Sequence, residues 1–353
     1  MVTMKDVAKA AGVSQAAVSY AFSGSPKVSA GQRNQILAVA AELGYHGPSI
    51  AGASLRSGRM GTVGVIIPGS LALAVEDPST ALLLKGIVEA GELADVALTL
   101  LPADGTATDP ARSPHSGALR GLVDGVVMHC LPDAHPVVAA ILARGIPAVA
   151  IDSPQVPHLP YVTVDHHAAG MVQANHLLAQ GHRRIGIITD RLGPIPQPGF
   201  RLPSAIPTAT ERYLRERLTG VLRACRDASI PDTDIAIVES AGIDRQSGLF
   251  AAEQLIAGFR PTGVLTTSDV HAAAALRVLA DNGIAVPQHA SVIGFDDAPI
   301  ADLLGLTTIR QPLVDKGRTA ATILLDLIAG RTRRRSVKPT ELVVRTTTGP
   351  APR

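Results

Sequence analysis

Histidine and cysteine are the residue types whose chemistry could support a metal site or an activated nucleophile. Four histidines lie near one another, but their spacing lacks the regular geometry of zinc ligands. They are His166, His167, His176 and His182. Cys130 and Cys225 lie far apart and form no CxxC pair, so neither a zinc site nor a disulfide framework is expected. No GxSxG, P-loop or GxGxxG string occurs. The residue types therefore predict no metal, no cofactor and no enzyme.

Charge is the second chemical signal, and it is unevenly distributed. Six basic and two acidic residues give residues 1–60 a net charge of +4, whereas the whole chain carries only +2. The basic residues are Lys5, Lys9, Lys27, Arg33, Arg56 and Arg59. The basic charge therefore sits at the N-terminal end.

Three short helices are predicted to position these basic groups. Thr3 with Asp6 three residues later can cap a first helix, which Gly12 ends. Ser14 can cap a second helix over 15–22, and Ser29 a third that closes at Gly44. Two helices joined by a tight glycine turn indicate a helix-turn-helix.

Four strings in this segment form a recognisable pattern: Met4–Ser14 (MKDVAKAAGVS), Val18-Ser19, Val28-Ser29 and Ala41–Tyr45 (AELGY). Together they closely resemble the headpiece of the LacI/GalR family of bacterial transcription repressors. The resemblance implies a DNA-binding headpiece over 1–47, whose second helix enters the major groove of double-stranded operator DNA.

The side chains that this resemblance places at the bases are uncharged. Gln15 can pair with adenine, Ala16 can contact a thymine methyl group, and Tyr20 can stack or donate one hydrogen bond. The alternative for Tyr20 is packing beneath the helix. Phosphate contacts then supply the salt-dependent affinity. The residues expected to make them are Lys5, Lys27 and Arg33, helped by Ser14 and Ser19.

Residues 48–60 are expected to form a hinge helix and linker. The stretch 48–58 is too short for a stable isolated helix, so it should order only on binding. In the family this helix inserts a leucine into the minor groove, and Leu55 matches that leucine. Gly47 looks like an insertion, and Ala53 stands where an arginine is common; both put the stability of the hinge in doubt.

From residue 61 onward, short apolar runs alternate with helical stretches, which predicts an α/β fold with parallel sheets. With 353 residues, 46% of them hydrophobic, the chain can bury a sizeable core in two or three domains. The expected strands are 62–67, 97–101, 125–128, 148–151, 161–164, 185–189, 235–239, 263–267 and 291–294. The expected helices are 81–93, 137–145, 168–180, 214–228, 247–258 and 270–283.

This order resembles the two-subdomain, periplasmic-binding-protein-like effector domain of the same family. Four strings carry the resemblance: Leu178–Ile185 (LAQGHRRI), Ser268-Asp269, Val292–Asp297 (VIGFDD) and Leu306–Pro312 (LTTIRQP). It implies an effector-binding and dimerisation domain over 61–353. Its N-subdomain is expected at about 61–163 and 293–323, and its C-subdomain at about 164–292 and 324–353.

The family resemblance also implies a small-molecule effector in the cleft between the subdomains, beyond the carboxyl ends of the strands. The matching residues are Asp152, Arg217, Ser268, Asp269, Asp296 and Gln311. Aspartate and arginine suit hydroxyl or carboxylate groups. With no Trp, four Tyr and five Phe, a sugar clamped between aromatic faces is not expected.

The segment 190–211 departs from the family pattern. Its five prolines are expected to forbid regular structure and to leave a long loop. Such a loop could carry Phe200 or Arg201 to the ligand, and disorder is the alternative.

These features predict a cytoplasmic, sequence-specific DNA-binding transcription regulator, a repressor that acts as a homodimer without membrane association. A small-molecule effector controls its operator affinity. The alternative is a solute receptor or ligand-binding module without DNA function. The identity of the effector and the direction of its effect stay open.

Overall fold

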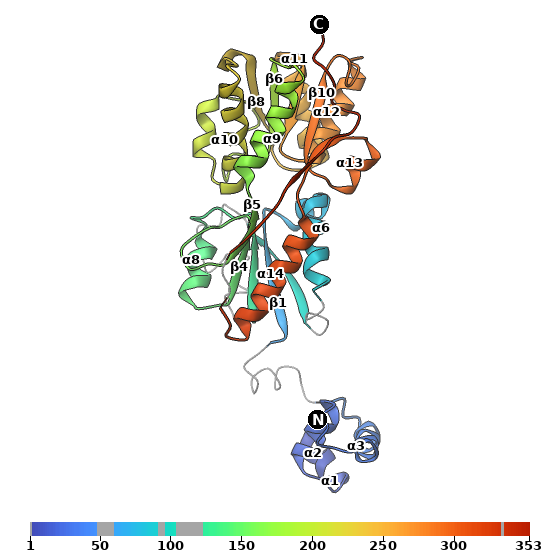
Figure 1. Cartoon of the computed structure of the whole chain (residues 1–353). Helices are drawn as coiled ribbons and strands as arrows, with labels where there is room; N and C mark the ends of the chain where they lie inside the picture. The colour runs from blue at the N-terminus through green and yellow to red at the C-terminus, as the bar shows by residue number, and fades with distance from the viewer. Residues whose placement is uncertain (1, 48–59, 91–95, 104–122, 333–334) are drawn as a thin grey trace. The chain divides into compact units, whose positions relative to one another are not determined.

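The computed structural model describes residues 2–47, 60–90, 96–103, 123–332 and 335–353 (Figure 1). The chain divides into two compact units, Met1–Gly61 and Thr62–Arg353. The expected hinge over 48–58, with Leu55, lies outside the described residues.

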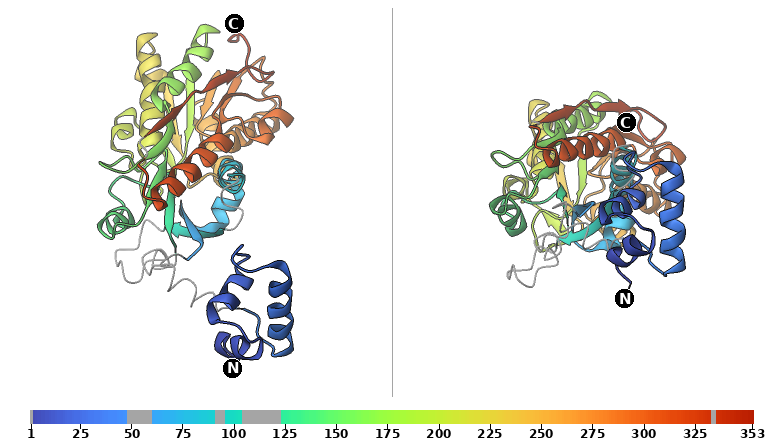
Figure 2. Two further views of the ribbon diagram at one scale, coloured as in Figure 1. Left: turned by 60° about the horizontal axis from the view of Figure 1, so that its bottom comes forward. Right: turned by 90° about the horizontal axis from the view of Figure 1, so that it is seen from below.

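The N-terminal unit contains the expected three helices: α1 (Met4–Ala10), α2 (Gln15–Phe22) and α3 (Ala30–Glu42). Figure 2 shows them from two further directions. Val7, Val18 and Ile36 each project from one helix into a shared, fully buried core. The predicted helix-turn-helix is confirmed, because helix starts and stops are local signals that the sequence carries.

The helix caps of this unit are those that the sequence predicts. The Oδ2 atom of Asp6 accepts from the backbone N–H of Thr3 at 2.9 Å. Ser14 Oγ accepts from the Ala17 N–H at 3.1 Å, and Ser29 Oγ accepts from the Gln32 N–H at 3.3 Å. Gly12 ends the first helix with φ +66°, a conformation that costs other residues energy.

The second unit holds two sheets. The six-stranded sheet is parallel and ordered β12-β5-β4-β3-β1-β2. Its strands are β1 (Thr62–Pro68), β2 (Ala97–Ala103), β3 (Gly125–His129), β4 (Ala148–Ile151), β5 (Tyr161–Val164) and β12 (Ser336–Lys338). Its helices are α5 (Leu71–Glu76), α6 (Pro78–Val88), α8 (Pro136–Ala143) and α14 (Leu313–Ile328).

The seven-stranded sheet is ordered β13-β11-β10-β9-β6-β8-β7, and only its edge strands β13 and β7 run antiparallel. Its strands are β6 (Ile185–Thr189), β7 (Gly199–Arg201), β8 (Ile235–Glu239), β9 (Gly263–Thr266), β10 (Ser291–Asp296), β11 (Thr307–Arg310) and β13 (Glu341–Val343). Its α-helices are α9 (His166–Ala179), α10 (Arg212–Asp227), α11 (Arg245–Gly258), α12 (Asp269–Asp281) and α13 (Pro299–Leu303), with 3₁₀ turns η2 (Pro203–Thr208) and η3 (Asp232–Asp234).

The expected subdomain boundaries need correction. The segment 293–311 was assigned to the first subdomain, but β10 and β11 pair with β9 and with each other in the seven-stranded sheet. The segment 324–338 was assigned to the second subdomain, but α14 packs on α6 and β12 pairs with β5. The chain therefore crosses between sheets after residues 164, 311 and 338. The places where the chain crosses depend on which strands pair, and the positions of sequence motifs do not show which strands pair.

The prediction for 190–211 was wrong in one respect, because part of the segment is regular. Gly199–Arg201 forms β7 against β8, and 203–208 forms the turn η2. The flanking prolines are compatible with this strand, because one side of an edge strand makes no backbone hydrogen bonds to a neighbouring strand. Phe200 lies half-exposed on this edge. Arg201 binds Glu239, with Nε 2.7 Å from Oε2.

Candidate functional sites

The exposed face of α2 carries the predicted base-reading residues. Gln15 and Ala16 are exposed at the start of the helix, while Val18 is buried on the opposite side. Ser19 and Tyr20 are partly buried. The Tyr20 ring packs against the headpiece core, and Lys27 Nζ lies 5.1 Å from its centroid. Tyr20 therefore packs beneath the helix, as its alternative interpretation predicted, but part of its side chain is exposed.

The basic residues predicted to contact phosphates differ in exposure and in whether they already make a hydrogen bond. Lys5 and Lys27 are exposed. Arg33 is partly buried, and its Nη2 donates to the Ser25 carbonyl at 2.9 Å, which ties the loop before α3 to that helix. Lys5 and Lys27 are thus the freer cations for a phosphate.

In the second unit, two of the predicted cleft residues follow strand ends with a left-handed backbone. Asp152 follows β4 with φ +63°, and Asp296 ends β10 with φ +118°. Backbone in this region is unfavourable for residues other than glycine and is often found at binding sites.

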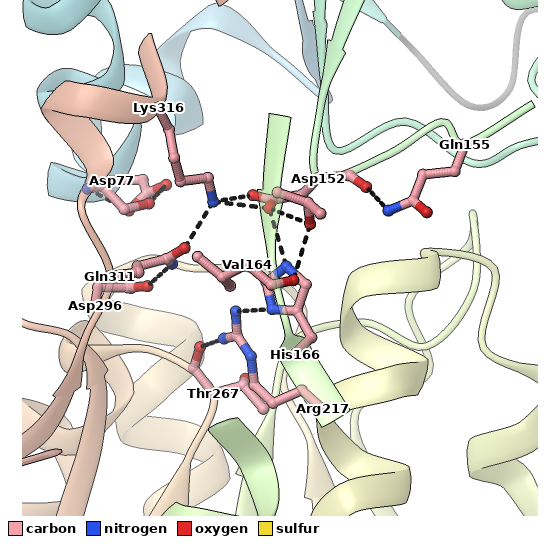
Figure 3. Close-up of polar contacts among 12 residues, drawn as sticks. Asp77, Asp152, Gln155, Val164, His166, Arg217, Thr267, Asp296, Gln311 and Lys316 are labelled. Carbon is pink, nitrogen blue, oxygen red and sulfur yellow. Dashed lines mark hydrogen bonds and ion pairs between the residues drawn. The ribbon is translucent and has the colours of Figure 1, made fainter. Parts of the chain in front are cut away.

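A chain of buried hydrogen bonds joins Asp152 to Asp296 through Lys316 (Figure 3). Lys316 Nζ lies 2.7 and 2.6 Å from the two carboxylate oxygens of Asp152, and it donates to Gln311 Oε1 at 2.7 Å. Gln311 Nε2 in turn donates to Asp296 Oδ1 at 2.6 Å. The Lys316 side chain is fully buried and that of Asp152 is 4% exposed. This chain of bonds links the two sheets.

The same carboxylate is joined to Arg217 through His166. His166 Nε2 lies 2.9 Å from Asp152 Oδ1, and His166 Nδ1 lies 3.3 Å from Arg217 Nη2. Arginine has no acceptor and a carboxylate has no donor, so the ring must accept at Nδ1 and donate at Nε2. Arg217 also donates to the Thr267 carbonyl at 2.6 Å and stacks on Phe295, with Cζ 3.3 Å from the ring centroid.

Close contact between α9 and α10 places Arg217. A Cβ atom on Gly170 would lie 2.1 Å from the Arg217 carbonyl oxygen, and one on Gly220 would lie 2.1 Å from the His167 carbonyl oxygen. Only glycine permits this approach, which brings the start of α9, with His166, beside Arg217.

Ser268 and Asp269 lie apart from this chain of bonds and serve the fold. Ser268 Oγ caps α12 by accepting from the His271 N–H at 3.2 Å. Asp269 accepts from the Ala298 N–H at 2.7 Å and from Thr308 Oγ1 at 2.6 Å. Both residues are 1% exposed. The structure therefore brings together four of the six predicted effector residues.

Burial and neighbouring charges shift the pKa values of these groups in opposite directions. Burial alone would raise the pKa of Asp152, but Lys316 and His166 outweigh it and hold that pKa well below its usual range. Burial lowers the pKa of His166 to about 4 despite the nearby carboxylate. Burial, reinforced by Asp269, raises the pKa of Asp296 well above its usual range against the opposing charge of Arg217. Asp152 is therefore ionised and His166 is neutral near pH 7, while burial favours the protonated form of Asp296.

His129, Cys130 and Asp152 come close enough to be weighed as metal ligands, with candidate ligand atoms within 4.8 Å of one another. Lys316 already contacts both oxygens of Asp152, so a cation would have to displace a buried ammonium group. We assign no metal to this cluster.

Sequence reasoning missed Lys316 and His166. Lys316 lies three residues after Leu313 and four before Ala320, both of which are buried, so the helical period places it on the inward face. His166 directly follows Asp165, whose side chain caps α9. The sequence near each residue thus carried a signal, but it could not show that both side chains bind Asp152.

Two cavities lie beyond the strand ends. One has a volume of about 70 Å³ and its lining includes Asp77, Asp190 and Gly242; the other has a volume of about 210 Å³ and its lining includes Leu131 and Glu211. Pro68 and Arg191 line both. The cavities thus lie between the two sheets, and no Phe, Tyr or Trp is among their described lining residues.

Comparison with known proteins gives matches along the chain. Residues 3–48 match the family described as bacterial regulatory proteins, lacI family, and residues 174–348 match a periplasmic binding protein-like domain. An HTH-type transcriptional regulator of Mycolicibacterium smegmatis is 33% identical over 91% of this chain and 89% of its own.

Two solved structures are similar over nearly their whole length. The lac repressor dimer bound to operator and the anti-inducer ONPF is 26% identical with a TM-score of 0.78, covering 99% of both chains. The transcriptional regulator CelR in complex with cellobiose is 27% identical with a TM-score of 0.66, covering 98% of this chain and 100% of its own. Among the described residues, no helix is long and apolar enough to cross a membrane.

Proposed function

Because the chain belongs to the lacI family of bacterial regulatory proteins, and is thus a DNA-binding transcription regulator, we propose that it represses transcription as a homodimer controlled by a small-molecule effector. The observation that carries this proposal is the pairing of a helix-turn-helix unit with a cleft whose two sheets are joined by buried charges. Its place of action is the cytoplasm, where the bacterial chromosome lies.

Operator recognition is assigned to α2 and the exposed lysines. Gln15, Ala16 and Tyr20 read the bases, while Lys5 and Lys27 contact phosphates. No acidic residue lies in α2 to repel the phosphate backbone. One headpiece buries too little DNA for operator-grade affinity, so two copies on a pseudo-palindromic site are required. The dimeric state of the similar lac repressor structure supports this requirement.

Effector control is assigned to the cleft. The chain crosses between the two sheets at three places, so their relative angle can vary. A ligand that favours one angle would change the direction in which β1, which begins at Thr62, continues from the DNA-binding unit. The Asp152 to Asp296 chain of bonds spans the same gap and would have to adjust with the angle. The cellobiose bound to the similar CelR structure supports a small polar molecule as effector.

Binding to genomic fragments across a salt series tests this function. We expect one or a few fragments to bind at least a hundredfold more tightly than the bulk, with affinity falling steeply as salt rises. Gln15→Ala should lower affinity for the selected fragment by about tenfold, because it removes one contact to a base. Arg277→Ala is the matched control, because Arg277 pairs only with Asp281 on the exposed face of α12 in the other unit. Binding without sequence preference at moderate salt would instead support a receptor without DNA function.

A further inference from the structure

The four clustered residues that were predicted to bind the effector are already engaged in hydrogen bonds, which Lys316 and His166 connect into one network. Lys316 contacts both oxygens of Asp152, and Gln311 is engaged at both its carbonyl oxygen and its amide nitrogen. Gln311 and Asp296 are 7% and 6% exposed. None of the four lines either of the two cavities. A ligand could therefore reach Asp152 only by displacing a buried ammonium group.

The open part of the cleft lies beside Arg191 instead. This residue follows β6 and lines both cavities, including the larger one of about 210 Å³. Its backbone position is fixed on both sides. The Asp190 N–H donates to Thr267 Oγ1 at 3.1 Å, and the carbonyl of the buried Leu192 accepts from the Thr210 N–H at 2.9 Å. Arg191 is thus presented to the cleft from an anchored segment.

The guanidinium of Arg191 is partly buried and has no hydrogen-bond or ion-pair partner in the part of the chain that the structure describes. Other arginines of similar exposure are engaged: Arg201 binds Glu239, and Arg212 binds Asp133. A planar guanidinium with five donors and no acceptor binds carboxylate and phosphate groups best, through paired hydrogen bonds. The charge of Arg191 opposes the rise that burial causes in the pKa values of the nearby Asp190 and Glu211, yet its guanidinium donors make no hydrogen bond in the described part of the chain and stand at the wall of both cavities.

Asp190 adds an acceptor next to this cation. Its Oδ1 atom is buried and has no partner among the described residues. Burial raises the pKa of Asp190 to about 6, against the opposing charge of Arg191, and burial also raises the pKa of Glu211. The Asp190 residue as a whole is only partly buried and lines the smaller cavity, where its carboxylate can accept a hydrogen bond from a ligand hydroxyl.

Most of the wall of the larger cavity is aliphatic, and its polar residues besides Arg191 are His135, Thr210 and Glu211. Its walls include Pro68, Ala103, Leu131, Pro132, Pro136 and Pro194. These aliphatic side chains offer contact area without hydrogen bonds. Arg191 is the cationic group of this wall, and it also lines the smaller cavity, which Asp190 lines beside it.

We propose that the effector of this chain is an acidic, hydroxylated small molecule, whose carboxylate or phosphate group binds Arg191 and whose hydroxyl group donates to Asp190. This assignment rests on the proposed function and specifies it. Lys316 then acts as a built-in cation that satisfies Asp152, so the specificity-determining contacts lie at Arg191 and Asp190 rather than along the Asp152 to Asp296 chain of bonds.

Calorimetric titration of the full chain with matched neutral and acidic probes tests the proposal. The pairs are glucose with glucuronate, glucose with glucose 6-phosphate, and ribose with ribose 5-phosphate; inorganic phosphate is a further probe. We expect at least one acidic member to bind ten times or more tightly than its neutral counterpart. Equal affinities within every pair, or no binding by any acidic probe, would overturn the proposal.

Variants locate the contact. Arg191→Met keeps the length of the side chain and removes its charge, so it should weaken the preferred acidic probe at least tenfold while leaving operator affinity without effector unchanged. Asp190→Ala should weaken the hydroxylated acid but not inorganic phosphate. Arg277→Met is the control. Unchanged binding in Arg191→Met would refute the assignment even if operator binding is intact, whereas loss of sequence-specific DNA binding in the unaltered chain would refute the proposed function itself.

Discussion

Replacing Lys316 with methionine probes the buried charges that join the two sheets. The substitution keeps the length of the side chain and removes the only ammonium group that contacts Asp152 in the described part of the chain. Asp152 would keep His166 and Thr163 as donors but lose its countercharge, with its side chain only 4% exposed. Removing one partner of a buried ion pair costs about 3–5 kcal/mol, and we expect a loss of that size.

The pH dependence of this loss has a definite sign. In the unaltered chain the pKa of Asp152 lies below its unfolded value, so its stabilising effect is present above about pH 4 and disappears as the pH falls further. In Lys316→Met, burial raises that pKa, and protonation removes the unpaired charge. The difference in unfolding free energy between the two proteins should therefore be largest near pH 7 and shrink toward pH 4.

Urea unfolding of the full chain, followed by circular dichroism, measures these differences. The double variant Lys316→Met/Asp152→Asn removes both charges and should recover most of the loss, giving a coupling energy of about 2 kcal/mol or more. Arg277→Met, which breaks an exposed pair, should leave stability unchanged. A loss below about 1 kcal/mol in Lys316→Met, or strictly additive effects in the double variant, would show that the pair does not hold the fold as described.

Three further outcomes follow from the same unit. Gly220→Ala should lower the free energy of unfolding in urea by about 3 kcal/mol, since the new Cβ would lie 2.1 Å from the His167 carbonyl oxygen. Gly31→Ala is the control in the helix-turn-helix unit; it has open space around the new Cβ and should be neutral or stabilising. The imidazole rings of His129 and His166 should titrate near pH 4 by NMR. In the unfolded chain both rings bind a proton below about pH 6.5, so the free energy of unfolding should fall as the pH drops from about 6.5 to 4. Titration near pH 6.5 in the folded protein would contradict the burial of these rings. Arg217→Met should abolish the effector response in an operator-binding assay while keeping operator affinity within about twofold, since it breaks the bonds to His166 and Thr267 and changes no residue of the helix-turn-helix. A retained response would exclude Arg217 from coupling.

Local patterns gave correct predictions wherever the determining contacts lie close in sequence. Ser14, Ser29 and the Thr3 to Asp6 pair cap the helices that they were expected to cap, because each bond spans three residues. The alternation of apolar runs and helical stretches likewise predicted the parallel sheets. It did not find β7, β11, β12 and β13, since these three- and four-residue strands form through pairing with distant strands.

The candidate cleft was predicted only in part. Family motifs identified Asp152, Arg217, Asp296 and Gln311, which the structure brings together, but also Ser268 and Asp269, whose hydrogen bonds serve the fold. Arg191 carried no motif at all. Its candidacy comes from two cavities and an unpaired guanidinium, which are properties of packed surfaces and not of spacing.

The sequence alone determined the family, the helix-turn-helix and the α/β alternation, because caps, turns and periodicity act over a few residues and do not depend on the rest of the fold. Tertiary structure decided which sheet takes 293–311, and it decided that Lys316 meets Asp152 across 164 residues. Such long-range contacts depend on which buried charges and strand edges find partners once all elements pack, a condition that no local pattern records.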